Sequence, residues 1–146
     1  MKTTQLSIFL ENRSGRLEEV LGVLTGAHIN IRALSLADTA DFGILRLIVD
    51  RPADGLATLQ QAGCTVVTTD VLAVEVPDCP GGLHSILHAI SSANINVEYM
   101  YAFVTRKTDK AIVVFRFPDT DAAIAALRAS GISILPPATV YELCAP

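Results

Sequence analysis

The chain has 146 residues, of which 51% are hydrophobic and 18% are charged, and its formal net charge is −4. This composition excludes a disordered chain and supplies enough apolar material for one medium domain or two small ones. The acidic balance argues against nucleic acid as a partner, and no apolar run approaches the roughly 18 residues that span a bilayer, so we expect a cytoplasmic protein with no membrane partner.

The first half of the chain predicts six elements in the order strand, helix, strand, strand, helix, strand. Apolar residues alternate from Gln5 to Leu10, which is typical of a strand with one buried face. Leu17, Val20, Leu21 and Leu24 follow at the spacing of a one-faced helix. The expected ranges are 5–10, 16–26, 29–36, 44–49, 53–62 and 65–69.

The second half of the chain repeats the first. Gly81 lies 66 positions after Gly15, and the same offset relates the helices that follow them. The offset becomes 68 after a longer second hairpin through Thr105–Asp109, so that Gly131 matches Gly63. A self-match of this length, with its change of offset placed in a hairpin loop, indicates duplication. We therefore predict two domains, residues 1–70 and residues 71–146.

The repeated order βαββαβ is that of the ferredoxin-like fold, in which an antiparallel sheet carries two helices on one face. The predicted fold class is α+β, with two such units. A unit of about 70 residues has a thin core and exposed strand edges, so we expect the two copies to pair. Pro136 and Pro137 interrupt the last strand, and the segment Thr139–Leu143 is expected to complete a sheet edge.

Two turns stand out because each joins a strand to a helix through glycine. They run from Asn12 to Leu17 and from Asp78 to Leu83. The first N–H groups of a helix have no partner within it, and the positive end of the helix dipole lies at the same point. Such a turn holds a carboxylate or a small anion without a charged side chain.

The segment Glu11-Asn12-Arg13-Ser14-Gly15, followed by an amphipathic helix and by Ile29-Asn30-Ile31, resembles the ACT domain. This is a small-molecule regulatory module attached to many amino-acid-metabolic enzymes. The turn is similar to the E-N-R-P-G version of bacterial phosphoglycerate dehydrogenases, with Ser14 in place of proline. The second turn, Asp78-Cys79-Pro80-Gly81, keeps the proline and has Asp for Asn. The resemblance covers nearly the whole chain, as two ACT units.

The resemblance implies a non-catalytic regulatory or sensor protein that holds an amino acid between paired ACT domains. It implies no cofactor and no metal, an amino-acid-metabolic enzyme or a regulator as the partner, and a homodimer. The turn containing Asn12 would be completed by Asn96, and the turn containing Asp78 by Asn30. The implied ligand-binding residues are Asn12, Arg13, Ser14, Gly15, Arg16, Leu17, Asn30, Ile31, Asp78, Cys79, Pro80, Gly81, Gly82, Leu83, Asn96 and Val97.

The chemistry of these turns suits a zwitterion. An asparagine side chain offers both a donor and an acceptor, the turn N–H groups supply further donors, and Asp78 favours an ammonium group. The dehydrogenase version carries a histidine two positions before the turn asparagine, where this chain has Leu10, which argues against a serine-like ligand. Tyr99, Met100 and Tyr101 are candidates to line an apolar pocket, although core packing is the commoner role of such residues.

The sequence also bears on functions other than amino-acid binding. A structural subunit that pairs with a partner without binding a ligand stays open as the alternative. His84 and His88 have metal-ligand spacing but no third ligand, and Cys79 lacks a base at catalytic spacing. Cys64, Cys79 and Cys144 form no C-x-x-C pair, so no disulfide framework is predicted. No acid–base constellation is repeated in the two halves, and no basic surface accompanies the strands, which argues against an enzyme and against an RNA-binding sheet.

Overall fold

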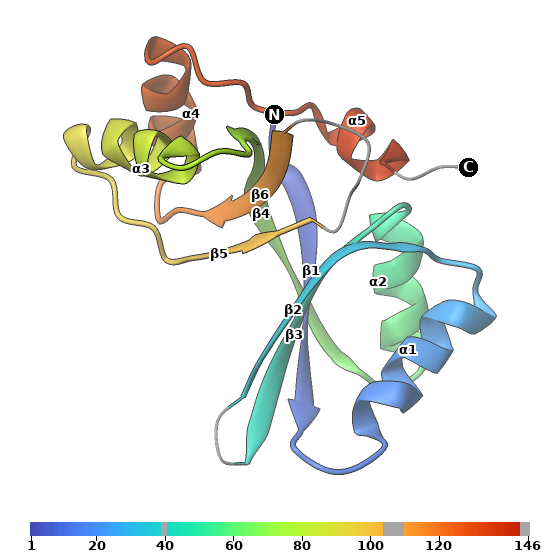
Figure 1. The fold of residues 1–146 in the computed structure, drawn as a ribbon. Coiled ribbons are helices and arrows are strands. Elements are labelled where there is room, and N and C mark those ends of the chain that lie inside the picture. The colour runs from blue at the N-terminus through green and yellow to red at the C-terminus, as the bar shows by residue number, and fades with distance from the viewer. Residues whose placement is uncertain (39–40, 104–109, 144–146) are drawn as a thin grey trace. The chain divides into compact units, whose positions relative to one another are not determined.

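The structure is a computed structural model of the 146-residue chain, and it describes residues 1–38, 41–103 and 110–143 (Figure 1). The predicted insertion at Thr105–Asp109 and Cys144 lie outside the described residues. The chain divides into two compact units, Thr4–Thr69 on the one hand and Asp70–Pro146 with Met1–Thr3 on the other. None of the helices in the described part of the chain is long and apolar enough to cross a membrane.

The first unit has the predicted order of elements. Its strands follow the hydrogen-bonded order β2-β3-β1-β4, and β3 is antiparallel to both of its neighbours. Helices α1 and α2 pack beside each other over one face of this sheet (Figure 1). The elements are β1 (Thr3–Glu11), α1 (Arg16–Gly26), β2 (Ile31–Asp38), β3 (Phe42–Val49), α2 (Pro52–Gln61) and β4 (Thr65–Pro77).

The second unit repeats this plan with a reduced last strand. Its strands follow the order β4-β6-β5, and α3 and α4 pack together. In place of a full fourth strand, Ile134 forms an isolated antiparallel bridge with Val74. The elements after β4 are α3 (Gly82–Ser92), β5 (Tyr99–Ala102), β6 (Lys110–Arg116), α4 (Thr120–Ala129) and α5 (Pro137–Glu142). The predicted fold class, α+β with ferredoxin-like βαββαβ repeats, is confirmed.

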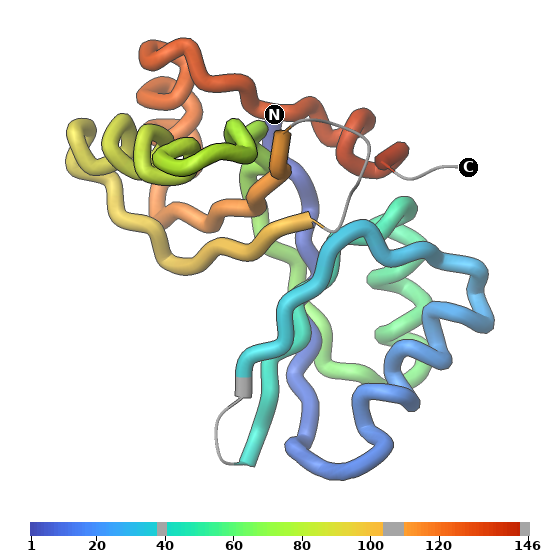
Figure 2. Tube along the Cα trace, viewed as in Figure 1, coloured from blue at the N-terminus to red at the C-terminus, as the bar shows by residue number. Residues whose placement is uncertain are grey.

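Two expected features of the strands are wrong. The separate strands expected at 65–69 and 71–76 are one continuous strand, β4, whose trace runs unbroken from Thr65 to Pro77 (Figure 2). No glycine or proline interrupts the β-branched run before Pro77, so nothing in the sequence ends the strand between the copies. The second strand, expected to open at Ile29, begins at Ile31 instead.

The C-terminal segment also differs from the expectation. Thr139–Leu143 does not complete a sheet edge, because residues Pro137–Glu142 form helix α5. Pro137 stands at the first helical position, where its missing N–H costs nothing and its fixed φ suits the helix. Val140 is the fully buried side chain of this short helix.

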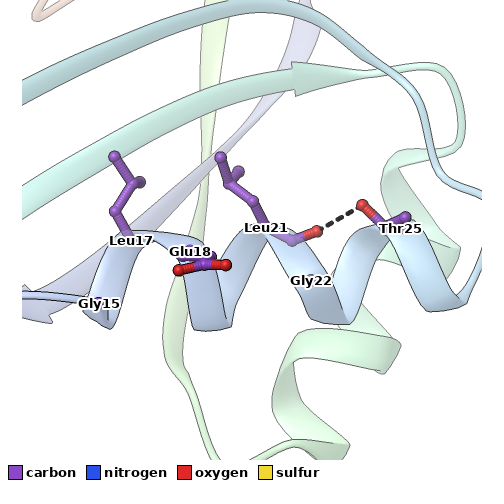
Figure 3. Close-up of a pocket in the computed structure, with 6 residues that line it drawn as sticks. All are labelled: Gly15, Leu17, Glu18, Leu21, Gly22 and Thr25. Atoms are coloured by element: carbon purple, nitrogen blue, oxygen red, sulfur yellow. Dashed lines mark hydrogen bonds between the residues drawn. The ribbon is translucent and has the colours of Figure 1, made fainter.

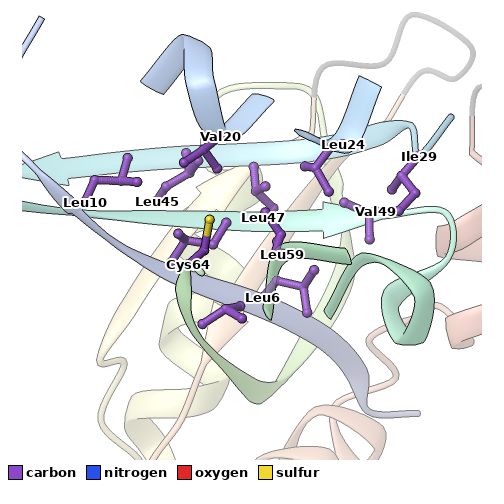
Figure 4. Packing of buried hydrophobic residues seen from close by; sticks show 12 residues of the cluster. Leu6, Leu10, Val20, Leu24, Ile29, Leu45, Leu47, Val49, Leu59 and Cys64 are labelled. Atoms are coloured by element: carbon purple, nitrogen blue, oxygen red, sulfur yellow. The ribbon is translucent and has the colours of Figure 1, made fainter. Parts of the chain in front are cut away.

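Each unit has its own apolar core between its sheet and its two helices. In the first unit, Leu6, Leu45 and Leu47 of the sheet lie in one cluster with Leu24 of α1 and Leu59 of α2 (Figure 4). All five side chains are buried, and burial of each stabilises the fold by about 1.5–3 kcal/mol. The second unit has an equivalent cluster around Leu72, Ile90, Phe115, Phe117 and Leu127.

The duplication extends to unusual backbone angles. His28 and Asn94, which follow α1 and α3, have φ angles of 54° and 56°, although neither is glycine. Gly63 and Gly131, which follow α2 and α4, have φ angles of 80° and 70°. Equivalent positions therefore hold the same left-handed conformations, and backbone groups at these positions can be compared directly between the units.

The core of the first unit can be tested by truncation of Leu59. Its side chain is fully buried between α2 and the sheet, so Leu59→Ala should lower the free energy of unfolding by about 2–5 kcal/mol. Gln60→Ala is the control, because Gln60 is next to Leu59 in α2 but has an exposed side chain, and its truncation should cost about 0.5 kcal/mol or less. Urea denaturation followed by circular dichroism measures both, and equal losses would contradict the assigned core.

Candidate functional site

The turn between β1 and α1 is built around Gly15. This residue has φ 82° and caps α1 from the left-handed region, which glycine adopts without steric cost. Within the turn, the N–H of Arg13 donates to the carbonyl of Glu11 (2.9 Å) and the N–H of Arg16 to that of Arg13 (3.3 Å). The N–H of Glu19 donates to the carbonyl of Gly15 (3.0 Å), which closes the first helical turn.

The turn between β4 and α3 has the same backbone bonds. Gly81 has φ 88°, the N–H of Cys79 donates to Pro77 (2.9 Å), and the N–H of Gly82 donates to Cys79 (3.0 Å). The N–H of Ser85 donates to Gly81 (2.9 Å), as that of Glu19 does to Gly15. The two predicted turns therefore share one backbone conformation.

Both turns leave two consecutive N–H groups without an acceptor. Within the described residues no hydrogen bond uses the N–H groups of Leu17 and Glu18 at α1, or those of Leu83 and His84 at α3. Neither helix has a side-chain cap, whereas the side chain of Asp119 caps α4. These unpaired donors lie at the positive end of each helix dipole, an arrangement that attracts a carboxylate.

The first turn carries a network of four charged side chains. Arg13 donates to Glu11 (3.0 Å) and, through both terminal nitrogens, to Glu19 (3.3 and 3.1 Å), and Arg16 also donates to Glu19 (3.1 Å). The hydrogen bonds from Arg13, and then those from Arg16, hold the pKa of Glu19 below its ordinary value. Both arginines thus have carboxylate partners within the turn, and they hold its shape.

The second turn is uncharged at the equivalent places. Pro77, Cys79, Gly82 and Ser85 stand where the first turn has Glu11, Arg13, Arg16 and Glu19. A Cβ added at Gly82 would overlap the carbonyl oxygen of Pro77, so only glycine fits there. The two turns therefore share a backbone but differ in charge and in side-chain bulk.

A surface hollow of about 560 Å³ adjoins the unpaired N–H groups of α1. Figure 3 shows Leu17 and Leu21 projecting from the same side of the helix, where they give this hollow an apolar wall. The volume lies within the range of about 300–1,000 Å³ that is usual for small-molecule sites. Its lining residues are Gly15, Leu17, Glu18, Leu21, Gly22 and Thr25.

A second, smaller hollow of about 70 Å³ lies on the other side of Leu17. Asn12 and Arg13 of the predicted set line it, together with Leu36 and Gly43 from the neighbouring hairpin. This space is too small for an amino acid as it stands. The turn residues therefore border two hollows, and Leu17 belongs to both.

The predicted asparagines lie far from the turns of their own units. Asn30 follows the C-terminal end of α1, and the 11 residues of that helix, at 1.5 Å per residue, separate it from Gly15 by about 16 Å. The backbone of Asn30 is paired with Asp50, whose N–H donates to its carbonyl and whose carboxylate accepts from its N–H. Asn96 holds the equivalent place after α3 and lines a separate hollow.

The other predicted residues have the following places. Ser14 is exposed in the first turn, and Asp78, Cys79 and Pro80 are exposed in the second. Ile31 and Leu83 are half-buried and pack against the cores of their units, as does Val97. Pro77 and Ser85, which flank the second turn, line a hollow of about 250 Å³ together with residues such as Ile86 and Lys110.

Three lining residues of the larger hollow were not predicted as site residues: Glu18, Gly22 and Thr25. The spacing of Glu18 to Gly22 and Thr25, at i+4 and i+7, places the three on one helical stripe and could have shown them to be neighbours. The hydroxyl of Thr25 donates to the carbonyl of Leu21 (2.9 Å), so its methyl group is held in a fixed direction (Figure 3).

Metal chemistry finds no support among the described residues, which contain no cluster of three metal-ligating side chains. His84 and His88 stack with ring centroids 6.4 Å apart on the exposed side of α3. Cys64 is buried, and Cys79 is exposed in its turn.

Comparison with known proteins places this arrangement in a family. A family model for an ACT domain pair matches residues 1–135. The crystal structure of protein BT0572 from Bacteroides thetaiotaomicron is 40% identical, covers 98% of each chain and superposes with a TM-score of 0.92. The regulatory subunit of aspartate kinase from Thermus thermophilus shares the fold at 18% identity, with 88% and 90% coverage and a TM-score of 0.64. Among curated proteins, no sequence matches this chain.

The charged network at the first turn predicts a response to acid. A carboxyl whose pKa is lower in the folded chain stabilises it above the unfolded pKa, and this stabilisation is lost as the pH falls through the folded pKa. In an NMR titration the Glu19 carboxyl should therefore show a midpoint below its ordinary value of 4.5, and Arg13→Ala should raise that midpoint. Lys110→Ala is the control, because Lys110 pairs with Glu75 instead. A midpoint that Arg13→Ala leaves unchanged would contradict the network.

Proposed function

The chain belongs to the family of ACT domain pairs, and from this premise we propose that it is a non-catalytic regulatory protein that binds a free amino acid. Residues 1–70 and 71–146 are the two ACT domains of the proposal. The observation that carries it is the repeated turn, in which Gly15 and Gly81 adopt the same left-handed conformation and leave equivalent N–H groups unpaired. Two copies of one backbone conformation with open donors favour a common ligand group.

The carboxylate of the amino acid takes the place of the missing helix cap. At α1 the N–H groups of Leu17 and Glu18 are its donors, and at α3 those of Leu83 and His84. Backbone donors at a helix start bind an anion without a charged side chain, which agrees with Arg13 and Arg16 already being bonded to Glu19.

The ammonium group requires acceptors, and each turn supplies a different one. Glu18 lines the hollow beside α1 and places a carboxylate next to the proposed carboxylate seat. Asp78 in the second turn offers a carboxylate in a segment with no other acidic side chain. An acceptor and a pair of donors within one turn match the two charges of a zwitterion.

In this proposal, each turn is completed by an asparagine of the opposite unit. Because about 16 Å of helix separates Gly15 from Asn30, one ligand cannot touch both residues. We therefore retain the pairing implied by the family, in which Asn96 completes the turn of Asn12 and Asn30 completes the turn of Asp78. Asn96 makes no hydrogen bond within the described part of the chain, so its side chain is available for a ligand.

The ligand proposed for the first turn is an apolar amino acid. Leu17 and Leu21 form the wall of the hollow, and Gly22 leaves space between them and Thr25. Leu10, where the dehydrogenase version has histidine, is buried in the core and offers no polar contact. These surroundings favour an aliphatic side chain over a hydroxyl group such as that of serine.

We also propose that the chain forms a homodimer and that a separate partner protein responds to it. Phe9, Leu34, Leu36 and Phe42 of the first sheet are 44–58% exposed, and β2 is the edge strand. Apolar side chains along an unpaired edge favour burial against another sheet, here that of a second copy. A change in this packing on ligand binding would be read by an enzyme or a regulator of amino-acid metabolism in the cytoplasm.

A structural subunit that binds no ligand is the second candidate. It is favoured by the two arginines of the first turn, which are already bonded to Glu19. A thermal-shift panel of the twenty amino acids separates the two functions. The sensor function requires that at least one amino acid raises the melting temperature.

Gly15→Val tests where the ligand binds. A valine at φ 82° is strained and displaces the N–H groups of the turn, so affinity for the amino acid identified in the panel should fall at least tenfold. Gly63→Val is the matched control, because Gly63 has φ 80° and equally open space but lies at the end of α2. Calorimetric titration of both variants, with circular dichroism to check folding, gives the answer. Equal affinities in the two variants would place the ligand elsewhere.

Asn96→Ala tests the pairing between units. Loss of one hydrogen bond of about 1 kcal/mol should weaken binding at the turn of Asn12 about fivefold. Ser92→Ala is the nearby comparison, because Ser92 is an exposed residue at the end of α3 and is not part of the proposed contact. Unchanged affinity in Asn96→Ala would remove Asn96 from the site while leaving the turn itself in place.

A further inference from the structure

The C-terminal end of α1 binds an arginine of its own unit. Terminal nitrogen Nη2 of Arg51 donates to the carbonyl of Ala27 (3.0 Å) and to that of His28 (2.8 Å). Terminal nitrogen Nη1 donates to a carboxylate oxygen of Asp54 (3.0 Å). The last carbonyls of a helix lie at the negative end of its dipole, so this place favours a cation. The first unit thus shows a guanidinium held by two carbonyls and one carboxylate.

The second unit presents the same carbonyls without an arginine. Ala93 and Asn94 stand where Ala27 and His28 stand in the first unit, and the φ angle of Asn94, 56°, matches that of His28. The equivalent of Arg51, at an offset of 68, is Asp119, so the charge at this place is reversed. One carboxylate oxygen of Asp119 accepts the N–H of Ala122 (2.9 Å), and this caps α4.

A hollow of about 380 Å³ lies at this place in the second unit. Its volume is within the usual range of small-ligand sites, about 300–1,000 Å³. No cationic side chain is among the described residues that line it. The lining residues are Ala93, Asn94, Ile95, Asn96, Pro118, Asp119 and Ala122.

A second residue difference between the two units leaves the hollow more open. Asp50 pairs with the backbone of Asn30 in the first unit, whereas Pro118 stands at its equivalent and has neither an N–H nor a carboxylate. The backbone groups and the side chain of Asn96 make no hydrogen bond within the described part of the chain. The end of α3 therefore lacks the backbone pairing that the equivalent end of α1 has with Asp50.

The neighbouring cations are engaged outside the hollow. Lys2 pairs with Asp121 (3.0 Å), and Arg116 pairs with Glu98 (3.2 Å) and donates to the hydroxyl of Thr120 (3.3 Å). Neither side chain lines the hollow, so the second oxygen of Asp119 and the two carbonyls remain open to an external donor.

We propose that this hollow binds a free small molecule through a guanidinium group, which takes the place that Arg51 takes in the first unit. The planar guanidinium donates to the carbonyls of Ala93 and Asn94 and to the free oxygen of Asp119. The rest of the molecule lies against Ile95, Pro118 and Ala122. The site lies at the opposite end of α3 from the turn of Gly81 and does not depend on amino-acid binding there.

Agmatine, which carries a guanidinium and no carboxylate, is the probe for this site. Calorimetric titration into the full chain should show saturable binding to one site that weakens with added salt. Asp119→Asn should reduce the affinity at least tenfold, because it removes the charge while an asparagine still caps α4. Glu142→Gln, which removes an exposed carboxylate elsewhere in the second unit, should leave the affinity unchanged. Absence of saturation, or equal effects of the two variants, would overturn the proposal.

Putrescine tests whether the group recognised is a guanidinium. It carries primary ammonium groups, which lack the two planar terminal nitrogens through which Arg51 reaches two carbonyls from one nitrogen and a carboxylate from the other. It should bind at least tenfold more weakly than agmatine, whereas equal affinities would reduce the site to a non-specific cation site and contradict the proposal.

Arg51→Ala provides an independent test in the first unit. Removal of this side chain exposes the carbonyls of Ala27 and His28 and the carboxylate of Asp54, so the number of agmatine molecules bound should rise from one to two. An unchanged number would show that these groups do not recognise a free guanidinium. Gly15→Val should leave agmatine binding unchanged, and Asp119→Asn should leave amino-acid binding unchanged, so failure of either proposal can be told from failure of the other.

Discussion

The left-handed conformation of Gly15 and Gly81 is the constraint on which the candidate site depends. With φ angles of 82° and 88°, these residues turn the chain from a strand into a helix and keep any side chain away from the helix start. The positions that would normally cap the helix are thus left to the solvent or to a ligand. The unpaired N–H groups of Leu17 and Glu18, and those of Leu83 and His84, are a direct result of this geometry.

After duplication, the two halves have kept the same backbone conformations but carry different side-chain chemistry. The turns keep the same hydrogen bonds, yet the first carries Arg13, Arg16 and Glu19 while the second has Cys79, Gly82 and Ser85 at the same places. The opposite ends of the helices differ in the same way, with Arg51 in one unit and Asp119 in the other. Because folding requires only the backbone and the core, the polar groups around it are free to differ between copies.

Much of this fold could be predicted from the sequence, because it is encoded locally. Helical spacing after Gly15 and after Gly81 gave both helices, and the common offset gave the duplication. The continuous strand β4 was missed, since a boundary between copies was expected to separate two strands although no turn residue stands there. Helix α5 was missed because Val140 and Leu143 were interpreted as strand residues rather than as a helix that begins at Pro137.

The side-chain networks could not be predicted in the same way. The bonds from Arg51 to Ala27 and His28 join residues more than twenty positions apart, and they depend on how α2 packs beside α1. The place of Glu18 beside a hollow likewise depends on the tilt of the helix. Residue type and spacing give a site's backbone, but the orientation of its side chains follows from tertiary packing.

The most direct test of the central claim is an NMR titration of the backbone amides with the amino acid that raises the melting temperature most. A carboxylate seated on a helix start should shift the amide signals of Leu17 and Glu18, or those of Leu83 and His84, more than any others. Largest shifts in residues outside both turns would show that the glycine-capped helix starts do not bind the ligand.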